Sequence, residues 1–407
     1  MIIGIDASSA NRCYKTGTEW YSYYLINGLA EIDKKNTYWL YSNTPLVGGL
    51  DDLVKTNKNF QAKILHWPFS GFWSLGRLSL EMLKFWARPD ILFVPAHSLP
   101  FFCPRKTLNT VHDIAFIKEG ATYEYPKFFQ KNRNVAWAFG LYLKLHFLLK
   151  RRQTKALSTD YIDWTTEFAL RRAKKIITVS QQTKKEIESV YKTNPTKIEV
   201  VYNGYNNHLY RKTTDNEMLS RVLEKYGLNS SYILYVGRLE KKKNIAALVE
   251  AYALLRERHP EIKEKLVLVG AAGFGYDEIK YTVEEYNLNS EVIALGWVEE
   301  GDMPYIYNAA SAFVFPTHYE GFGIPVIQAM ACGVPSAVSD IPVLHEVTDD
   351  CALFFNKDNK NDIAEKLFTI LSDDNVKQKL ISTGYNRAAM FSWKKCAAET
   401  LAVIEKM

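Results

Sequence analysis

Residues 318–333 combine a carboxylate, two closely spaced glycines and a helix start in one short segment. They follow an apolar run at 312–315 that we expect to be a buried strand, and Pro325 suits the first turn of a helix, where its missing N–H costs nothing. A helix that starts there presents unpaired N–H groups and the positive end of its dipole, which favours a diphosphate. Glu320, just before the helix, can accept hydrogen bonds from sugar hydroxyls, although an acidic residue there can equally cap the helix.

Two further features of this segment favour a ligand with a phosphate and a sugar. Gly321 and Gly323 have no side chain and allow the backbone to approach a ligand closely. Gln328 lies about one turn into the expected helix and can reach a ribose. The segment therefore predicts a binding site for an activated sugar.

A basic loop follows the apolar run at 232–236 and supplies cations. Arg238 and Lys243 lie in it, with Lys241 and Lys242 between them. Cleavage of a bond between a sugar and a diphosphate places negative charge on the leaving group, so fixed cations that contact this group stabilise the reaction. The simpler interpretation of a lysine run is a solvated loop, and Lys241 and Lys242 fit it.

The first half of the chain offers weaker candidates. Gly17 precedes an apolar helical pattern that starts at Trp20, and a glycine there admits a phosphate or a sugar near the backbone. This segment is not the GxGxxG pattern of dinucleotide-binding proteins. His112 closes another expected strand and brings an imidazole to the strand end, but a single histidine is more often a satisfied polar group.

The elements that must position these residues alternate between short apolar runs and helical patterns. Runs that are apolar on both faces are typical of parallel sheets covered by helices on both sides, and such sheets bind ligands at the carboxyl ends of their strands. A polar stretch after residue 204 separates two groups of runs, so we expect two α/β domains that meet near residue 205. The expected strands are 2–5, 91–94, 107–111, 176–179, 232–236, 266–269, 292–295 and 312–315.

The composition is that of a folded globular protein. The chain has 407 residues, of which 47% are apolar and 24% charged. Its five cysteines are scattered without CxxC pairs, so we expect neither disulfides nor a structural metal, and a cytoplasmic location without a signal peptide fits best. Residues 1–205 carry 29 Lys and Arg against 17 Asp and Glu, but these cations do not follow an aromatic-studded groove, which argues against nucleic-acid binding.

Segment 128–152 is unusually apolar and basic. Its apolar stretch of about 15 residues is too short to span a bilayer, which needs about 20. A broad aromatic and aliphatic helix face flanked by cations is typical of a helix at the membrane surface, and the alternative is a buried domain helix with solvated ends. The first hypothesis implies peripheral contact with the cytoplasmic face of a membrane.

Taken together, these segments resemble the retaining glycosyltransferases of family 4, which have the GT-B fold of two Rossmann-like doubly wound domains with a cleft between them. The resemblance extends along nearly the whole chain. Its more specific parts are the loop at 237–244 and the segment that contains Glu320. Its weaker parts are the Gly17 loop and the segments 111–113, 176–180 and 201–204.

The resemblance implies a role for each candidate residue. Arg238 and Lys243 hold the donor diphosphate with Gly17 beside it, Glu320 contacts the transferred sugar, and His112 lies near that sugar. The remaining donor-binding positions are Gly321, Phe322, Gly323, Ile324, Pro325 and Gln328. The family has a second glutamate where this chain has Gln328, which can still bond to ribose hydroxyls but can change the nucleotide preference.

The resemblance also implies a domain plan and a mechanism. Residues 1–205 form an acceptor-binding domain, residues 206–387 bind the donor, and a closing helix at 388–407 crosses back to the first domain. The sugar passes to an acceptor hydroxyl with retention of configuration and without a protein nucleophile, while the leaving phosphate helps to take the acceptor proton. The basic loop takes the place of a divalent ion, so we expect no metal and no other cofactor.

The implied partners are a UDP-, GDP- or dTDP-sugar as donor and a lipid-linked or polysaccharide acceptor, in the synthesis of a cell-surface polysaccharide, O-antigen or glycolipid. Two alternatives remain. A nucleotide-sugar 2-epimerase would consume the donor without an acceptor. A non-catalytic nucleotide-binding scaffold of a membrane-bound assembly would keep its function after substitution of Glu320.

Overall fold

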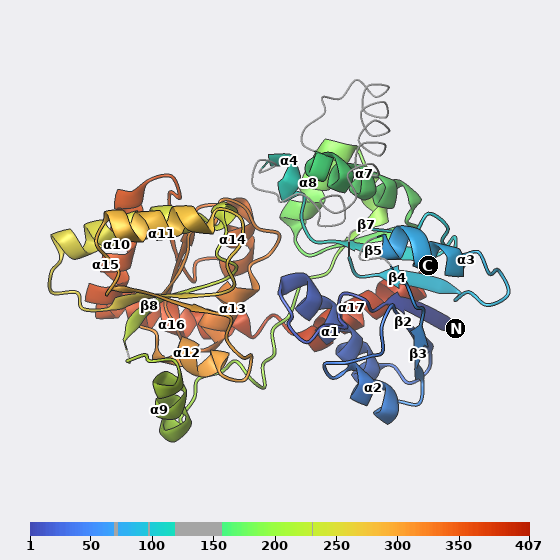
Figure 1. The fold of residues 1–407 in the computed structure, drawn as a ribbon, viewed down its shortest axis with the longest axis horizontal. Helices are drawn as coiled ribbons and strands as arrows, with labels where there is room; N and C mark the ends of the chain where they lie inside the picture. The colour runs from blue at the N-terminus through green and yellow to red at the C-terminus, as the bar shows by residue number, and fades with distance from the viewer. Residues whose placement is uncertain (69–71, 97, 119–156, 230) are drawn as a thin grey trace. The chain divides into compact units, whose positions relative to one another are not determined.

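The fold is seen in a computed structural model, drawn in Figure 1, which describes residues 1–68, 72–96, 98–118, 157–229 and 231–407. The chain divides into two compact units. The first comprises Met1–Gly204 together with Trp393–Met407, and the second comprises Tyr205–Ser392. The helix expected at 128–152 lies outside the described residues and stays a prediction.

The first unit is built on a seven-stranded parallel sheet with the strand order β3-β2-β1-β4-β5-β6-β7. The central strands β1, β4 and β5 are almost wholly buried, as expected for strands covered on both faces. Four of the seven strands, β1, β4, β5 and β6, are those that the apolar runs predicted. The strands are β1 (Ile2–Asp6), β2 (Thr37–Ser42), β3 (Phe60–Ile64), β4 (Ile91–Val94), β5 (Thr107–Val111), β6 (Lys175–Thr178) and β7 (Ile198–Val200).

Helices connect these strands, and the last helix of the chain packs among them. Helix α17 lies against α1: the ring of Trp393 stacks on that of Tyr24 with centroids 5.5 Å apart, and a Cβ added to Gly28 would lie 2.8 Å from that of Ala397. The helices are α1 (Gly17–Ile32), α2 (Leu50–Thr56), α3 (Ser79–Met82), α4 (Ala115–Lys118), α7 (Leu157–Arg172), α8 (Gln181–Tyr191) and α17 (Trp393–Glu405), with a π-helical turn at Trp73–Leu78 and a 3-10 turn at Pro195–Lys197.

The second unit has a six-stranded parallel sheet with the order β10-β9-β8-β11-β12-β13. Helices α10 to α16 accompany its strands (Figure 1). The strands are β8 (Tyr232–Val236), β9 (Lys265–Val269), β10 (Val292–Gly296), β11 (Ala312–Phe315), β12 (Ser336–Ser339) and β13 (Leu353–Phe355). The helices are α9 (Asn216–Lys225), α10 (Ile245–Arg258), α11 (Tyr276–Glu285), α12 (Met303–Ala309), α13 (Ile324–Ala331), α14 (Pro342–Thr348), α15 (Lys360–Ser372) and α16 (Asp374–Ala388), with a 3-10 turn η4 at Lys241–Lys243.

Each sheet reverses its winding direction at one point. In the second sheet the chain runs from β8 outward to β9 and β10, then returns to β11 on the other side of β8 and continues to β13. In the first sheet the same reversal falls between β1 and β4. The loops that leave two such neighbouring strands diverge to opposite faces and open a crevice, which is where doubly wound sheets bind ligands.

Two boundaries differ from the expectation. Helix α1 begins at Gly17 and not at Trp20, because Thr16 and Glu19 form a capping box that starts the helix earlier. Residue 388, the expected start of the closing segment, is the last residue of α16, and the chain enters the first unit at Trp393.

Candidate functional site

The crevice between β8 and β11 holds an ion pair between two predicted site residues. Lys243 ends the 3-10 turn η4 after β8, and Glu320 lies in the loop after β11. The ammonium of Lys243 donates a hydrogen bond to Oε1 of Glu320. Their side chains are only 12% and 15% exposed, so both charges lie largely out of water. This edge of the sheet therefore holds a cation and a carboxylate in one small, weakly solvated space.

Backbone contacts between the two loops hold this pair in place. The N–H of His318 donates to the carbonyl oxygen of Lys242 at 3.0 Å, and the Thr317 hydroxyl donates to the same oxygen at 3.3 Å. The ammonium of Lys243 also lies 5.7 Å from the ring centre of Phe315, the last residue of β11. The position of the pair is thus set by two loops that leave adjacent strands.

Arg238 occupies the same strand end but is more accessible. Its side chain is 53% exposed, and its Nε lies 3.8 Å from Oε2 of Glu240. Glu240 also pairs with Lys242 at 3.3 Å, and Lys241 pairs with Glu278 at 3.0 Å on the surface. The guanidinium of Arg238 is therefore loosely held and open to an anionic ligand, whereas Lys241 has the surface role that its sequence suggested.

Tyr235, the fourth residue of β8, is fully buried and supports this loop from the sheet. Burial raises the pKa of the Tyr235 phenol well above its ordinary value, and the charges of Glu320 and Glu240 raise it further. The hydroxyl stays protonated and donates to the carbonyl oxygen of Arg238 at 3.2 Å. A neutral phenol thus supports the backbone that carries Arg238.

The loop after β9 also belongs to the site, and the sequence analysis missed it. The N–H of Leu239 donates to the carbonyl oxygen of Ala271, and that of Lys241 to Phe274. A Cβ at Gly270 would lie 2.0 Å from the carbonyl oxygen of Gly237, so only glycine allows this approach. The spacing of the glycines at 270, 273 and 275 directly after a strand was the available signal.

Helix α13 begins as the sequence predicted, at the crevice edge. Gly323 has φ +104° in the left-handed region and precedes Ile324, with Pro325 in the first turn. Gly321 is buried beside it. Phe322 is 3% exposed, and its ring meets that of Phe391 edge to face at 5.6 Å. The ring is a core side chain, so the contribution of Phe322 to a ligand site would come from its backbone.

Gln328 lies further along α13 and is partly buried. The hydroxyl of Tyr307, from α12, donates to Oε1 of Gln328 at 3.3 Å. Tyr307 is fully buried, and burial raises its pKa well above the ordinary value, so it acts as a neutral donor. This contact uses one of the two acceptor sites of the amide oxygen and fixes the direction of the amide, whose nitrogen can donate to a ligand.

Gly17 and His112 belong to the first unit, where Gly17 begins the helix α1 that follows β1, and His112 follows β5. His112 is 9% exposed, and its Nε2 donates to the carbonyl oxygen of Pro95, in the loop after β4, at 2.9 Å. Tyr21 of α1 meets the imidazole edge to face at 4.6 Å. A Cβ at Gly17 would meet no described atom within 4 Å, so packing does not require glycine there.

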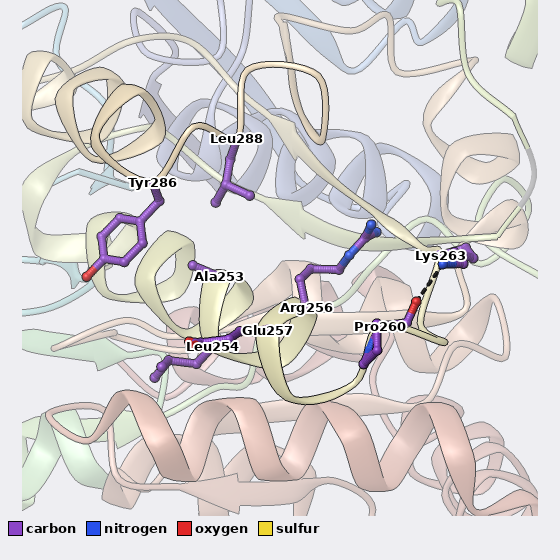
Figure 2. A pocket seen from close by; sticks show the side chains of 8 residues that line it. All are labelled: Ala253, Leu254, Arg256, Glu257, Pro260, Lys263, Tyr286 and Leu288. Carbon is purple, nitrogen blue, oxygen red and sulfur yellow. Dashed lines mark hydrogen bonds between the residues drawn. The ribbon is translucent and has the colours of Figure 1, made fainter.

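A separate shallow pocket lies at the opposite edge of the second sheet (Figure 2). Its walls come from the end of α10 and from the segments that lead into β9 and β10, which is the amino edge of the strands. It contains no residue of the crevice between β8 and β11. The lining residues are Ala253, Leu254, Arg256, Glu257, Pro260, Lys263, Tyr286 and Leu288.

Among the described residues there is no group of three or more His, Cys, Asp or Glu side chains that could hold a metal ion. The absence of a metal from the reaction stays a prediction. All five cysteines are free thiols, with Cys13 exposed and the others buried. No helix in the described ranges has the length and apolar character needed to cross a membrane.

Comparison with known families connects this fold and site to one class of protein. Two family profiles match consecutive parts of the chain: "Glycosyltransferase Family 4" matches residues 16–208, and "Glycosyl transferases group 1" matches residues 221–387. The second match contains every candidate residue at the crevice between β8 and β11. The fold is therefore assigned as GT-B, and the two matches make the chain similar to glycosyl transferases in both units.

Individual relatives agree with this assignment. The chain is 34% identical over 246 residues to O-antigen chain mannosyltransferase B of Escherichia coli, a match that covers 59% of this chain and 63% of that protein. It is 27% identical over 306 residues to O-antigen chain mannosyltransferase RfbU of Salmonella typhimurium, covering 75% and 70% of the two chains.

Solved structures share the fold over the full length. Sucrose-phosphate synthase from Thermosynechococcus elongatus superposes with a TM-score of 0.72 at 18% identity, covering 100% of this chain and 98% of that one. Anabaena HepE, determined in complex with UDP and glucose, gives a TM-score of 0.71 at 17% identity, with 100% and 99% covered. At these identities the likeness establishes the GT-B fold.

Proposed function

We propose that this protein transfers a hexose from a nucleoside diphosphate donor to an acceptor hydroxyl with retention of configuration. The observation that carries the proposal is the weakly solvated Lys243–Glu320 pair beside Arg238, at the reversal point of the second sheet. A cation beside a carboxylate suits a ligand whose diphosphate is bound to a sugar: the cations bind the phosphates and the carboxylate accepts sugar hydroxyls.

In this proposal the donor enters at the carboxyl ends of β8 and β11. Arg238 and Lys243 bind the diphosphate and stabilise the charge that develops as the bond to the sugar breaks. The N–H groups at the start of α13, with Gly321, Phe322, Gly323, Ile324 and Pro325, add the positive end of a helix dipole. Glu320 holds the sugar, and Gln328 donates through its amide nitrogen to a ribose oxygen.

Retention requires that the acceptor attacks the face that the diphosphate leaves. We propose that the acceptor hydroxyl passes its proton to the departing phosphate, so that no protein base is needed, and that the fixed cations serve in place of a divalent metal. Gly17 and His112, in the first unit, stay proposed positions for the donor phosphates and sugar.

The names of the relatives support a proposed biological setting. The names of two of them describe O-antigen chain mannosyltransferases, so mannose is the first sugar to test and a lipid-linked or polysaccharide glycan the first acceptor class. HepE has been solved with UDP, so UDP is compared with GDP and dTDP. We propose that the protein works at the cytoplasmic surface of a membrane, where such acceptors are assembled.

Calorimetric titration with UDP, GDP and dTDP in EDTA tests the donor site. We expect one nucleotide to bind to the wild type and binding to weaken about tenfold or more in Arg238→Ala, because a charged hydrogen bond contributes about 1.5 to 3 kcal/mol. Tyr281→Ala, on α11, is a matched surface control. Failure of all three nucleotides to bind would reject the proposed donor site.

A second assay separates transfer from epimerisation. We expect the identified nucleotide sugar to be consumed only when an acceptor glycan is present, and the anomeric proton of the product to show the configuration of the donor. Consumption without acceptor, with a changed sugar still attached to the nucleotide, would identify an epimerase. Stimulation by a divalent ion after EDTA treatment would contradict metal independence.

A further inference from the structure

Large apolar side chains are exposed together on the first unit. Twelve such side chains are exposed in the described part of the chain, and five lie within residues 80–102. Trp86 is 85% exposed and Phe85 is 68% exposed. Exposed apolar residues that occur singly need no explanation, whereas a cluster marks a contact surface. We call these five residues the apolar patch: Leu80, Phe85, Trp86, Phe101 and Phe102.

Two neighbouring segments carry the apolar patch. The N–H of Phe102 donates to Oγ of Ser79 at 3.0 Å, which places residues 101–102 beside α3 and Leu80. Phe85 and Trp86 follow the end of α3 and lead into β4, which pairs with β5. The patch therefore comes from two segments of the first unit, one before β4 and one after it, and the second lies beside the start of α3.

The patch is anchored and is not a loosely attached loop. The ring of Phe101 lies 5.9 Å from that of Trp164 and 5.6 Å from that of Phe168, both on α7. The side chain of Met82, between Leu80 and Phe85, is buried in the core of the unit. Phe101 and Met82 thus attach both segments of the patch to the body of the unit.

Cations surround the patch. Residues 84–106 contain Lys84, Arg88, Arg105 and Lys106, with Asp90 as their one acidic residue. The guanidinium of Arg88 lies over the ring of Phe85 at 4.8 Å. Lys84 pairs with Glu81, but Arg88, Arg105 and Lys106 form no ion pair within the described part of the chain. The surface combines exposed aromatic rings with a net positive rim.

We propose that the apolar patch binds the surface of an anionic lipid bilayer. Phe and Trp rings enter the boundary between headgroups and acyl chains, while Lys and Arg reach anionic headgroups. A second copy of the chain is a poorer occupant, because a symmetric dimer through this patch would bring its four cations against the same four. The patch contains no residue of segment 128–152, so separate variants can address the two.

Sedimentation of the full chain with vesicles tests the proposal. Vesicles of phosphatidylethanolamine with phosphatidylglycerol are compared with vesicles of phosphatidylcholine alone, at low and high salt. We expect the wild type to bind to the anionic vesicles. The double variant Phe85→Ser, Trp86→Ser should bind at least about tenfold more weakly, because it lacks the free energy that each aromatic ring gains when it leaves water. Arg105→Gln with Lys106→Gln should weaken binding about fivefold per cation, and only on anionic vesicles.

Tyr281→Ser is the matched control, since Tyr281 is 66% exposed on α11 of the second unit and should bind like the wild type. Absence of wild-type binding would overturn the proposal. Unchanged binding by both double variants would also overturn it and assign the membrane contact elsewhere. A dimer of the wild type that both variants dissociate would overturn it as well, in favour of a second copy of the chain. The measurement needs no donor, so its failure leaves the proposed transferase function standing.

Discussion

The Lys243–Glu320 pair allows a test in which stability and ligand binding respond differently. Lys243→Met removes the ammonium but keeps much of the side-chain volume. Glu320, 15% exposed, then has no cation beside it in a space that water reaches poorly. Adding Glu320→Gln removes the carboxylate charge as well. The two variants thus share the loss of the cation and differ in whether an unpaired carboxylate remains.

The expected change in the free energy of unfolding follows from the burial of the pair. Removing one partner of a fully buried pair costs about 3 to 5 kcal/mol, so for this slightly exposed pair we expect Lys243→Met to lower the free energy of unfolding by about 2 to 3 kcal/mol. The double variant leaves no bare charge and should lose less than about 1 kcal/mol. Both should bind the nucleotide about 10- to 100-fold more weakly, because both lack a charged hydrogen bond to phosphate.

Urea unfolding followed by circular dichroism measures the first quantity, and calorimetry measures the second. Lys243→Arg is the control that keeps a cation at this position. If the double variant is as unstable as Lys243→Met, the lysine stabilises the fold by something other than its pairing with Glu320. If Lys243→Met binds the nucleotide like the wild type, the assignment of Lys243 to the donor site is wrong.

Three further results are expected. Gly270→Ala should destabilise the second unit by at least about 3 kcal/mol, because φ is +144° and the new Cβ would meet the carbonyl oxygen of Gly237. Thermal unfolding measures this loss, and an unchanged midpoint would refute the close approach of these two glycines. Gly17→Ala should leave the thermal midpoint equal or higher, because alanine favours a helix and the space around residue 17 is open. If the donor approaches this backbone, the same variant should lower the transfer rate about tenfold, and an unchanged rate would remove Gly17 from the site. At pH 8 a thiol reagent should modify the exposed Cys13 rapidly and the buried Cys332 and Cys396 slowly. Burial raises the pKa values of Cys332 and Cys396, and a thiol reacts as its thiolate. The fast phase of modification should disappear in Cys13→Ser.

Local patterns predicted most of the sheet framework. All eight apolar runs are strands, because continuous burial leaves a signal in a few adjacent residues. Two of the missed strands carry weaker signals: β3 has exposed side chains, and β12 consists of Ser336, Ala337, Val338 and Ser339, which are buried but small or polar. Such strands are recognised by their neighbours in the sheet and not by their own composition.

The candidate site was predicted in part. The loop after β8 and the start of α13 were found, because charged residues and glycines directly after a strand are local features. The loop after β9 was missed, although it supports Arg238, because its glycines gain meaning only from the close approach of Gly270 to Gly237. Segment 128–152 stays a prediction.

The sequence by itself determined two groups of parallel strands, the helix start at Ile324–Pro325 and the presence of cations and a carboxylate at strand ends, since each depends on residues that are close in the chain. Only the tertiary structure joined Lys243 to Glu320, which are 77 residues apart, and directed the hydroxyl of Tyr307 to Gln328. It also placed α17 in the first unit, which the family resemblance implied but no local pattern showed. These contacts depend on the order of strands and on side-chain packing between distant segments, and local periodicity carries no information about either.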